Sequence, residues 1–213
     1  FTGDISIFAK TAGWNYDVEE FLARWLEQCR LEQLEKGQIP ITVPYTKAYS
    51  EYGFNPGWTS AGWGDGIIFI PWDLYEMYGD KYILQTNYNA MEKWMDYVIF
   101  CARETMPERY YMDFSNNQRQ QYLWNTGFHW GDWQIPGYDS FEGARLTKEI
   151  TASLFYYRQT MTMQKICDVL EKRERKNFYH ELSQKIKEAF TEEYIKDGRL
   201  TTEFQGLYCM ALA

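Results

Sequence analysis

The sequence predicts an all-α fold, and three observations support this prediction. Apolar residues recur at three- and four-residue spacing along several segments, whereas no segment alternates convincingly between apolar and polar residues as a strand would. Short and long connections alternate between these segments. Because helices joined by short connections form antiparallel hairpins, we expect helical hairpins whose long loops share one end. This arrangement suits a toroid of helix pairs or a helical solenoid, and the lack of an exact sequence period argues against a strict repeat protein.

The first segment with clear helical spacing starts well inside the chain. Residues 1–16 look irregular. A helix is expected from about Asp17, where Glu20 completes a cap-like pattern, to a stop near Gly37. Residues 38–63 are rich in proline and glycine, which favours a loop.

Two helices joined by a tight connection are expected next. The first covers about 65–78, and Pro71 predicts a kink or a later start. Gly79 ends this helix and Asp80 caps the following one at once. That following helix covers about 81–105 and carries a sustained apolar face.

The second half contains a long loop and three further helices. The loop covers about 107–145 and shows no helical periodicity. A helix follows Thr147 and ends near Lys172, and another covers about 174–196. The last helix is expected from Thr201 to the final residue, with the given sequence stopping within it.

Two loops combine an acid with tryptophans. The long loop contains the stretch Phe128–Trp133, and an earlier loop contains Trp58 and the stretch Gly62–Gly66. Long irregular connections in compact domains are usually functional or disordered, and aromatic richness argues against disorder. Tryptophan rings stack on the apolar face of a sugar while a carboxylate accepts hydrogen bonds from its hydroxyls. We therefore expect these loops to lie together at one mouth of the helical scaffold.

Three acids are candidate ligands of a polar substrate, and each also has a structural explanation. Asp4 would stabilise a turn, and Asp65 would cap the helix that follows it. Asp132 would cap a turn, although its tryptophan neighbours favour a functional role. Trp63 is flanked by glycines, so it either packs against a neighbour or forms a stacking platform. No pair of carboxylates is identified by spacing alone as the acid and base that a glycosidase needs.

Composition and charge exclude several classes of partner. The formal net charge is −8, which argues against nucleic acid and against anionic membrane surfaces, and there is no apolar run long enough to cross a membrane. Aromatic residues make up 19% of the chain, and many lie in loops. This balance is compatible with a neutral ligand.

Metal and cofactor sites are not indicated. No cysteine pair has the spacing of a metal site, and we expect all four cysteines to be small buried residues. The two histidines make a histidine metal site or a serine–histidine triad improbable, and His129 is expected to form hydrogen bonds rather than carry protons. The residues concerned are Cys29, Cys101, Cys167, Cys209, His129 and His180.

Several motifs together resemble the catalytic domain of bacterial α-L-rhamnosidases, glycoside hydrolase family 78. Each is weak alone, but they occur in the family's order along essentially the whole chain. They are Phe1-Thr2-Gly3-Asp4, Thr11–Asp17, Gly62-Trp63-Gly64-Asp65, Pro71–Asp80, Gly131-Asp132-Trp133, Asp197-Gly198 and Gln205.

The resemblance implies about half of an (α/α)6 barrel and inverting hydrolysis of terminal α-L-rhamnosides. It implies that the general acid glutamate precedes Phe1 and that the general base glutamate lies beyond residue 213, so this chain alone would be inactive. By the same resemblance, the residues that bind rhamnose are Asp4, Trp63, Asp65, Asp132 and Trp133.

The expected domain is a single segment, 1–213, of a six-hairpin catalytic domain truncated at both ends. Its expected partners are a rhamnose-containing glycoside or oligosaccharide and other domains of a parent chain, without nucleic acid, membrane, metal or cofactor. The resemblance implies a bacterial protein and leaves its compartment open. Phe1 stands where the family usually has Trp, and Gly66 replaces a common Ala. The alternatives are another (α/α)6-barrel glycosidase and a non-catalytic helical module that binds carbohydrate or serves as a scaffold.

Overall fold

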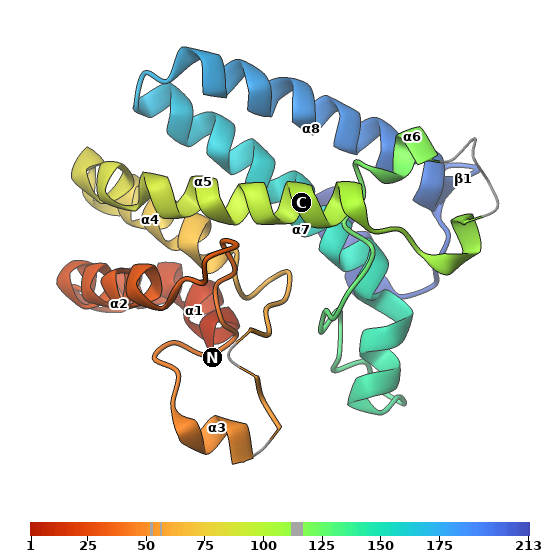
Figure 1. Cartoon of the computed structure of the whole chain (residues 1–213), viewed down its shortest axis with the longest axis horizontal. Helices are drawn as coiled ribbons and strands as arrows, with labels where there is room; N and C mark the ends of the chain where they lie inside the picture. The colour runs from red at the N-terminus through yellow and green to blue at the C-terminus, as the bar shows by residue number, and fades with distance from the viewer. Residues whose placement is uncertain (52, 56, 112–116) are drawn as a thin grey trace.

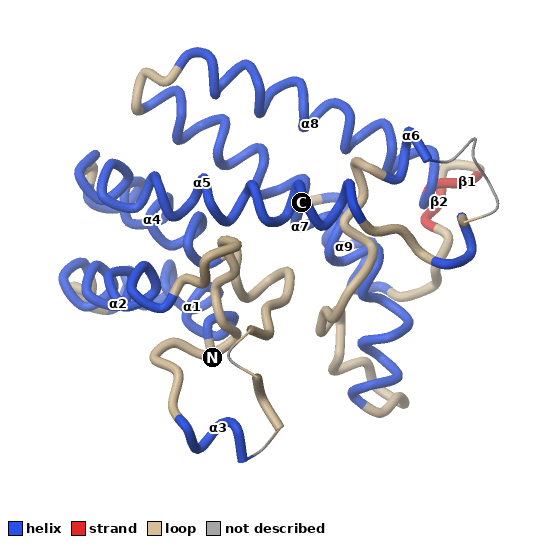
Figure 2. The backbone as a smooth tube through the Cα atoms, in the orientation of Figure 1, coloured by secondary structure: helices blue, strands red, loops and turns tan. Residues whose placement is uncertain are grey.

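The computed structural model describes residues 1–51, 53–55, 57–111 and 117–213, and it confirms an all-α fold (Figures 1 and 2). The longer helices lie in two layers. Consecutive members of an inner layer contact one another, and an outer layer packs on them. The inner helices are α1 (Thr2–Asn15), α4 (Gly66–Tyr78), α7 (Ser140–Val169) and α9 (Gln205–Leu212), and the outer helices are α2 (Glu19–Glu32), α5 (Lys81–Glu104) and α8 (Arg173–Tyr194).

Each inner helix except α9 is followed by an outer helix after a short connection. In Figure 1 the connections from α4 to α5 and from α7 to α8 lie at the same side of the molecule, and the long loops lie toward the other end. The long loops contain α3 (Lys47–Glu51), the 3-10 helix η1 (Glu108–Tyr110) and α6 (Asn117–Gln120). Three hairpins and one further inner helix correspond to about half of a six-hairpin barrel, as expected.

Helix α1 contradicts the expectation that residues 1–16 are irregular. Its buried residues are small, and they recur at helical spacing: Thr2, Gly3, Ser6, Ala9 and Ala12. Small side chains let the α1 backbone approach α4, and a Cβ built on Gly66 of α4 would lie 3.4 Å from the Cβ of Ser6. Larger apolar residues of α1, including Trp14, are exposed. The helix was missed because a search for large apolar residues does not detect such a face.

The middle of the fold agrees well with the sequence. Helix α2 begins close to Asp17 but ends at Glu32, before Gly37. Helix α4 begins at Gly66 and continues through Pro71, so the later start is wrong. Gly79 adopts the left-handed conformation, with φ 76°, and the Asp80 carboxylate accepts a hydrogen bond from the backbone N–H of Tyr82, as their stop and cap roles require.

Helix α7 begins at Ser140 rather than after Thr147 because Asp139 caps it. The Asp139 carboxylate accepts hydrogen bonds from the backbone N–H groups of Phe141 and Glu142. The predicted long loop is therefore shorter at this end. Its residues 112–116, and residues 52 and 56 of the earlier loop, lie outside the described part of the chain.

Two short strands, which the sequence did not predict, lie just before the expected start of the last helix at Thr201. Strands β1 (Ile195–Lys196) and β2 (Arg199–Leu200) form an antiparallel hairpin. Its turn residues, Asp197 and Gly198, both have positive φ, at 51° and 75°, as a two-residue hairpin turn demands. Helix α9 begins only at Gln205.

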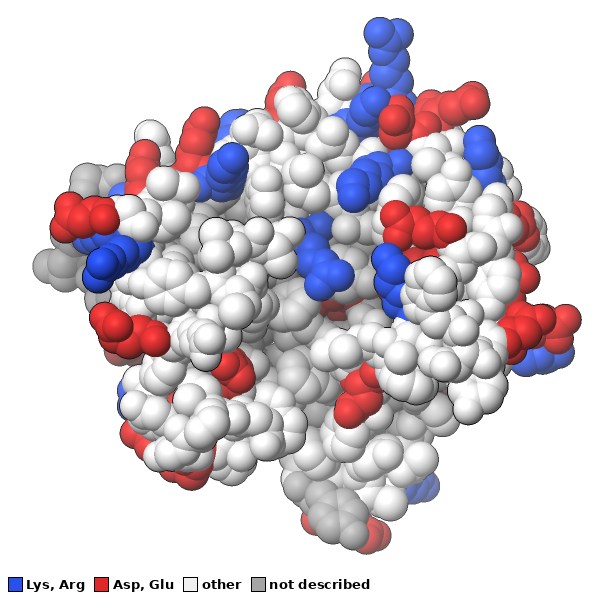
Figure 3. Space-filling model, turned by 180° about the vertical axis from the view of Figure 1, so that it is seen from behind, with Lys and Arg blue, Asp and Glu red and all other residues white. Residues whose placement is uncertain are grey.

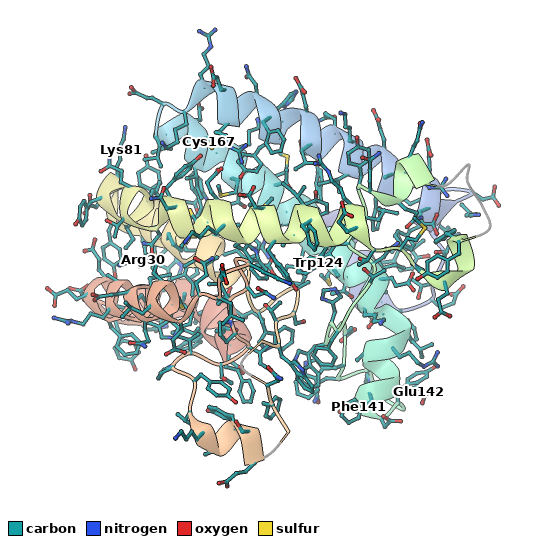
Figure 4. All side chains as sticks on the ribbon, viewed as in Figure 1. Arg30, Lys81, Trp124, Phe141, Glu142 and Cys167 are labelled. Atoms are coloured by element: carbon teal, nitrogen blue, oxygen red, sulfur yellow. The ribbon has the colours of Figure 1, made fainter. Side chains whose placement is uncertain are left out.

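One main apolar core fills the space between the layers, and a smaller cluster lies where α7, α8, β2 and α9 meet. The outer helices are also joined directly: Arg30 of α2 donates a hydrogen bond of 2.6 Å to the side-chain oxygen of Asn87 on α5, and Arg30 is labelled in Figure 4. Cys29 and Cys167 are buried, whereas Cys101 is half-buried and Cys209 is exposed, so the expectation of four buried cysteines is only partly right. Among the described residues, no helix has the length and apolar character needed to span a membrane.

Candidate functional site

A continuous series of aromatic contacts joins the two tryptophan loops. Trp63 lies 6.1 Å from Trp130 between ring centroids, and Trp130 lies 5.5 Å from Trp133. Phe128 packs edge-on against Trp130 at 5.0 Å and stacks on Trp58 at 5.3 Å. The loops therefore meet at the end of the molecule where the inner helices α1, α4 and α7 begin. The structure thus brings the loops together as the sequence predicted.

Hydrogen bonds fix the two loops to each other beneath the rings. The Nδ1 atom of buried His129 accepts a hydrogen bond of 3.1 Å from the backbone N–H of Ala61. The Ser60 hydroxyl accepts one of 3.2 Å from the backbone N–H of Trp130. Because backbone groups of one loop bond to side chains of the other, the spacing of the tryptophans is set by the loop backbones.

His129 is a fixed structural group and not a proton carrier. With Nδ1 accepting from Ala61, Nε2–H donates to the carbonyl oxygen of Thr126 at 3.0 Å, and the ring packs edge-on against Trp124 at 4.5 Å. Burial lowers the pKa of His129 to about 3, because the charged imidazolium loses hydration that its neighbours do not replace. The expectation that His129 serves as a hydrogen-bonding neighbour is confirmed.

Asp65 lies beneath the aromatic surface rather than on it. Its side chain is fully buried, and Oδ2 accepts a hydrogen bond of 2.5 Å from the backbone N–H of Gly62. It occupies the N-cap position of α4 without capping it through its side chain. Burial raises the pKa of Asp65 to about 7. In this arrangement Asp65 supports the loop that carries Trp63, and its carboxyl does not reach a surface where a ligand could touch it.

Trp63 both packs against a neighbour and exposes part of its ring. A Cβ built on Gly3 would lie 2.7 Å from Cε2 of Trp63, so the indole lies directly against the first turn of α1. Trp63 remains half-buried, and it contacts Trp130. The glycine at position 3 is therefore required by the close approach of the indole.

Asp132 and Trp133 lie between the starts of α7 and α9. The backbone N–H of Asp132 donates to the Thr147 hydroxyl of α7 at 2.7 Å. A Cβ built on Gly206 of α9 would lie 2.6 Å from Oδ2 of Asp132. The carboxylate is half-buried beside the first turn of α9, where the helix dipole favours negative charge. Trp133 is 36% exposed and can offer its ring to a ligand.

Asp4 is the most accessible of the candidate acids. It lies exposed in the first turn of α1, one residue after the glycine that supports Trp63. Phe1 at the start of the same segment is 51% exposed and packs against Tyr49 and Phe54 at 5.9 and 5.8 Å. Trp63 and Trp133 therefore belong to one aromatic surface, Asp132 directly precedes Trp133, and Asp4 lies exposed in the helical turn against which Trp63 packs, whereas Asp65 is buried beneath the surface.

A large cavity lies away from this surface. It measures about 690 Å³ and is lined by the inner helices toward their C-terminal halves, with both basic and acidic residues: Lys10, Asp73, Glu76, Arg158 and Lys165. The face seen in Figure 3 is hollowed, and side chains of both charges lie in and around the hollow. None of the five candidate site residues lines this cavity.

Two contributors to the site were not among the binding residues expected from the sequence. Trp130 is the ring that connects Trp63 with Trp133, and Gly3 provides the space for Trp63. Trp130 belongs to the aromatic stretch Phe128–Trp133 that the sequence indicated as functional, although no separate role was expected for it. The role of Gly3 depends on a contact between distant segments, which local pattern does not reveal.

Comparison with known proteins identifies relatives along the whole chain. The model of the family described as the bacterial α-L-rhamnosidase six-hairpin glycosidase domain matches residues 1–213. An α-L-rhamnosidase of Formosa agariphila is 28% identical over 216 residues, which cover 100% of this chain and 21% of that protein. An α-L-rhamnosidase of Alteromonas sp. is 38% identical over 97 residues, covering 46% of this chain and 10% of that protein.

Solved structures show the same fold. The α-L-rhamnosidase of Aspergillus terreus has a TM-score of 0.79 at 27% identity, over 100% of this chain and 22% of that one. The Streptomyces avermitilis α-L-rhamnosidase, solved in complex with L-rhamnose, has a TM-score of 0.77 at 24% identity, over 100% of this chain and 18% of that one. The chain therefore spans about a fifth of the length of these relatives.

Proposed function

The chain belongs to the family of bacterial α-L-rhamnosidase six-hairpin glycosidase domains, and from this membership we propose that the protein containing it hydrolyses terminal α-L-rhamnosides. In this proposal the chain is a segment of a longer catalytic domain. It supplies part of the surface that holds the rhamnose ring. The relatives that it matches are named α-L-rhamnosidases, and one α-L-rhamnosidase with the same fold was solved with L-rhamnose bound.

One observation carries the proposal: two acid-and-tryptophan loops, distant in sequence, meet at the N-terminal end of the inner helices. Trp63 and Trp133 flank Trp130. Asp132 directly precedes Trp133, and Asp4 lies exposed in the first turn of α1, against which Trp63 packs. An apolar sugar face would stack on the rings, and the two carboxylates would accept hydrogen bonds from its hydroxyls. Charge-assisted hydrogen bonds of this kind are the stronger ones, so they would fix the orientation of the ring.

Asp65 has a supporting role in this proposal. Its buried carboxyl holds the backbone of Gly62 and so places Trp63, without itself touching the sugar. We propose this role in place of the direct contact that the family resemblance implied for Asp65.

The chemistry itself would be that of an inverting glycosidase. One glutamate protonates the leaving oxygen while another activates water on the opposite face of the sugar, through an oxocarbenium-like transition state. By family resemblance, both glutamates lie outside this chain. The residues present here would bind and orient the ring, and preorganised carboxylates would stabilise the positive charge that develops on it.

The test is an assay of the full-length protein that contains this chain. Turnover of a chromogenic α-L-rhamnoside, without turnover of the matched α-D-glucoside, is the expected result. Turnover of the glucoside alone would assign the protein to another type of (α/α)6-barrel glycosidase. Binding of rhamnose without hydrolysis of either compound would identify a non-catalytic carbohydrate-binding module.

A further inference from the structure

We propose that the pocket beside Trp58 and Phe128 is a second subsite, which binds a neutral pyranose linked to the rhamnose. This inference rests on the proposed function and extends it, because it assigns a place to the part of the substrate beyond the terminal sugar. The pocket measures about 260 Å³ and lies between residues 57–59, residues 124–129 and the C-terminal part of α5. It shares no residue with the set Asp4, Trp63, Asp132 and Trp133.

The walls of the pocket carry exposed aromatic surface. Trp58 is 41% exposed and Phe128 is 38% exposed, and their rings stack on each other with an interplanar angle of 29°. Trp124 of the opposite wall is nearly fully buried; Figure 4 labels this residue close to α5. Aromatic rings that are held rigidly but left open to solvent are suited to stacking on the apolar face of a sugar.

A buried hydroxyl in the wall offers a polar contact. Thr59 is only 7% exposed, and its Oγ1 has no hydrogen-bond partner within the described parts of the chain. Buried polar groups in folded proteins are normally paired, and Thr59 lines the pocket, so in this proposal a ligand hydroxyl is the missing partner. By contrast, the Thr105 and Thr126 hydroxyls at the rim already bond to each other.

Among the described residues, none that lines the pocket is Asp, Glu, Lys or Arg. The buried imidazole of His129 is neutral, as its two hydrogen bonds require, and the nearby Lys148 ammonium is already bonded to the Gly127 carbonyl at 2.9 Å. The thiol of Cys101 donates no negative charge, because burial raises its pKa. An aromatic lining in which the described residues offer an unpaired hydroxyl and no charged side chain suits a neutral hydroxylated ring.

The pocket is continuous with the surface proposed to hold rhamnose. Phe128 forms part of the pocket wall, and it packs edge-on against Trp130 at 5.0 Å. Trp130 in turn contacts Trp63 and Trp133. A disaccharide can therefore place one ring on each side of Phe128, with the glycosidic bond between them.

The experiment compares two substrates of the full-length protein by measuring released L-rhamnose. One is methyl α-L-rhamnopyranoside, which has no second ring, and the other is a disaccharide with α-L-rhamnose linked to glucose. The variants are Trp58→Ala and Thr59→Val, the latter nearly isosteric and so expected to fold. Tyr82→Ala is the matched control, because Tyr82 is 67% exposed at the far end of α5.

The quantity to compare is the ratio of kcat/KM for the disaccharide to kcat/KM for the methyl glycoside. We expect this ratio to fall about tenfold in Trp58→Ala, the lower end of what loss of one apolar pocket contact causes, to fall less in Thr59→Val, and to stay unchanged in Tyr82→Ala. A ratio unchanged in both pocket variants overturns the subsite alone. A wild-type protein that hydrolyses neither rhamnoside overturns the proposed function, and the subsite with it.

Discussion

The backbone N–H of Ala61 donates a hydrogen bond of 3.1 Å to Nδ1 of His129. This bond joins the two tryptophan loops at their base, and the Nε2–H bond to Thr126 fixes the ring from its other side. The aromatic surface above depends on this connection, because Ala61 and His129 stand close in sequence to Trp63 and Trp130. His129 therefore determines the geometry of the site without being part of its chemistry.

Replacing His129 by alanine should destabilise the protein. The variant leaves the buried N–H of Ala61 without a partner and removes the packing against Trp124, which together should cost about 3 kcal/mol. Urea unfolding at pH 7 measures this loss. His180→Ala is the control, because His180 is exposed, and it should leave stability almost unchanged. Equal losses in the two variants would contradict the role assigned to His129.

The same variant should have a distinctive pH dependence. The folded-state pKa of His129, about 3, lies below its usual value of 6.5, so between these values the unfolded state binds more protons. In the wild type, the contribution of His129 to the free energy of unfolding is therefore lost as the pH falls from about 6.5 toward 3. His129→Ala has no such loss, so its stability deficit should shrink between pH 7 and pH 4. A deficit independent of pH would contradict a neutral, buried His129.

Asp65→Asn should show the opposite trend. The folded-state pKa of Asp65, about 7, is raised above the usual 3.8, so the stability that Asp65 contributes falls as the pH rises from about 4 through 7. Asparagine keeps an acceptor for the Gly62 N–H and carries no charge. The variant should therefore gain stability relative to wild type between pH 4 and pH 8, on the order of 3 kcal/mol. Melting temperatures of both proteins, measured across this pH range, test the prediction. A difference in melting temperature that does not change with pH would contradict a buried carboxyl at position 65.

Gly3→Ala should displace Trp63 without unfolding α1. The new Cβ would lie 2.7 Å from the indole, while alanine favours the helix by about 1 kcal/mol. We expect near-normal melting and a fall in kcat/KM for an α-L-rhamnoside of about tenfold, because small displacements of positioning groups are costly. Gly13→Ala, in the same helix but against the flexible Met77 side chain, is the control. Normal activity in Gly3→Ala would show that the position of Trp63 is unimportant.

Asp132→Asn separates a substrate contact from a structural role. If the carboxylate holds the sugar, the variant of the full-length protein loses rhamnoside turnover by tenfold or more, which is about 1.4 kcal/mol, and melts close to wild type. If it mainly stabilises the start of α9 beside Gly206, melting temperature falls instead and turnover per folded molecule is kept. Asp139→Asn is the control, since asparagine also caps helices and Asp139 lies outside the aromatic surface.

The sequence predicted the helices whose buried faces are large and apolar. Helix α5 agrees with the expected bounds almost to the residue, and it carries Leu84, Met91 and Val98 on one buried face. The sequence also predicted that the two tryptophan loops lie together. Both depend on strong local signals. The burial of Asp65 was not predicted. An Asp just before a helix gives the same sequence pattern whether its side chain caps that helix or accepts a hydrogen bond from the preceding loop.

The missed elements carried weaker signals. Helix α1 packs through small residues, and its N-terminus has no side-chain cap. The early start of α7 was indicated by Asp139 with Glu142 three residues later, a capping pattern. The strand hairpin was indicated by Asp197-Gly198, which suits a two-residue turn. Patterns of two to four residues such as these also occur where no helix or hairpin forms. The surrounding packing determines whether each of them forms the element that it suits.

The central claim is that rhamnose lies on the aromatic surface between the two loops. A crystal structure of the full-length protein with L-rhamnose bound measures this directly. The account predicts the ring against Trp63 and Trp133, with its hydroxyls within hydrogen-bond distance of the carboxylates of Asp4 and Asp132. Rhamnose bound elsewhere, with these four side chains facing only solvent, would contradict it.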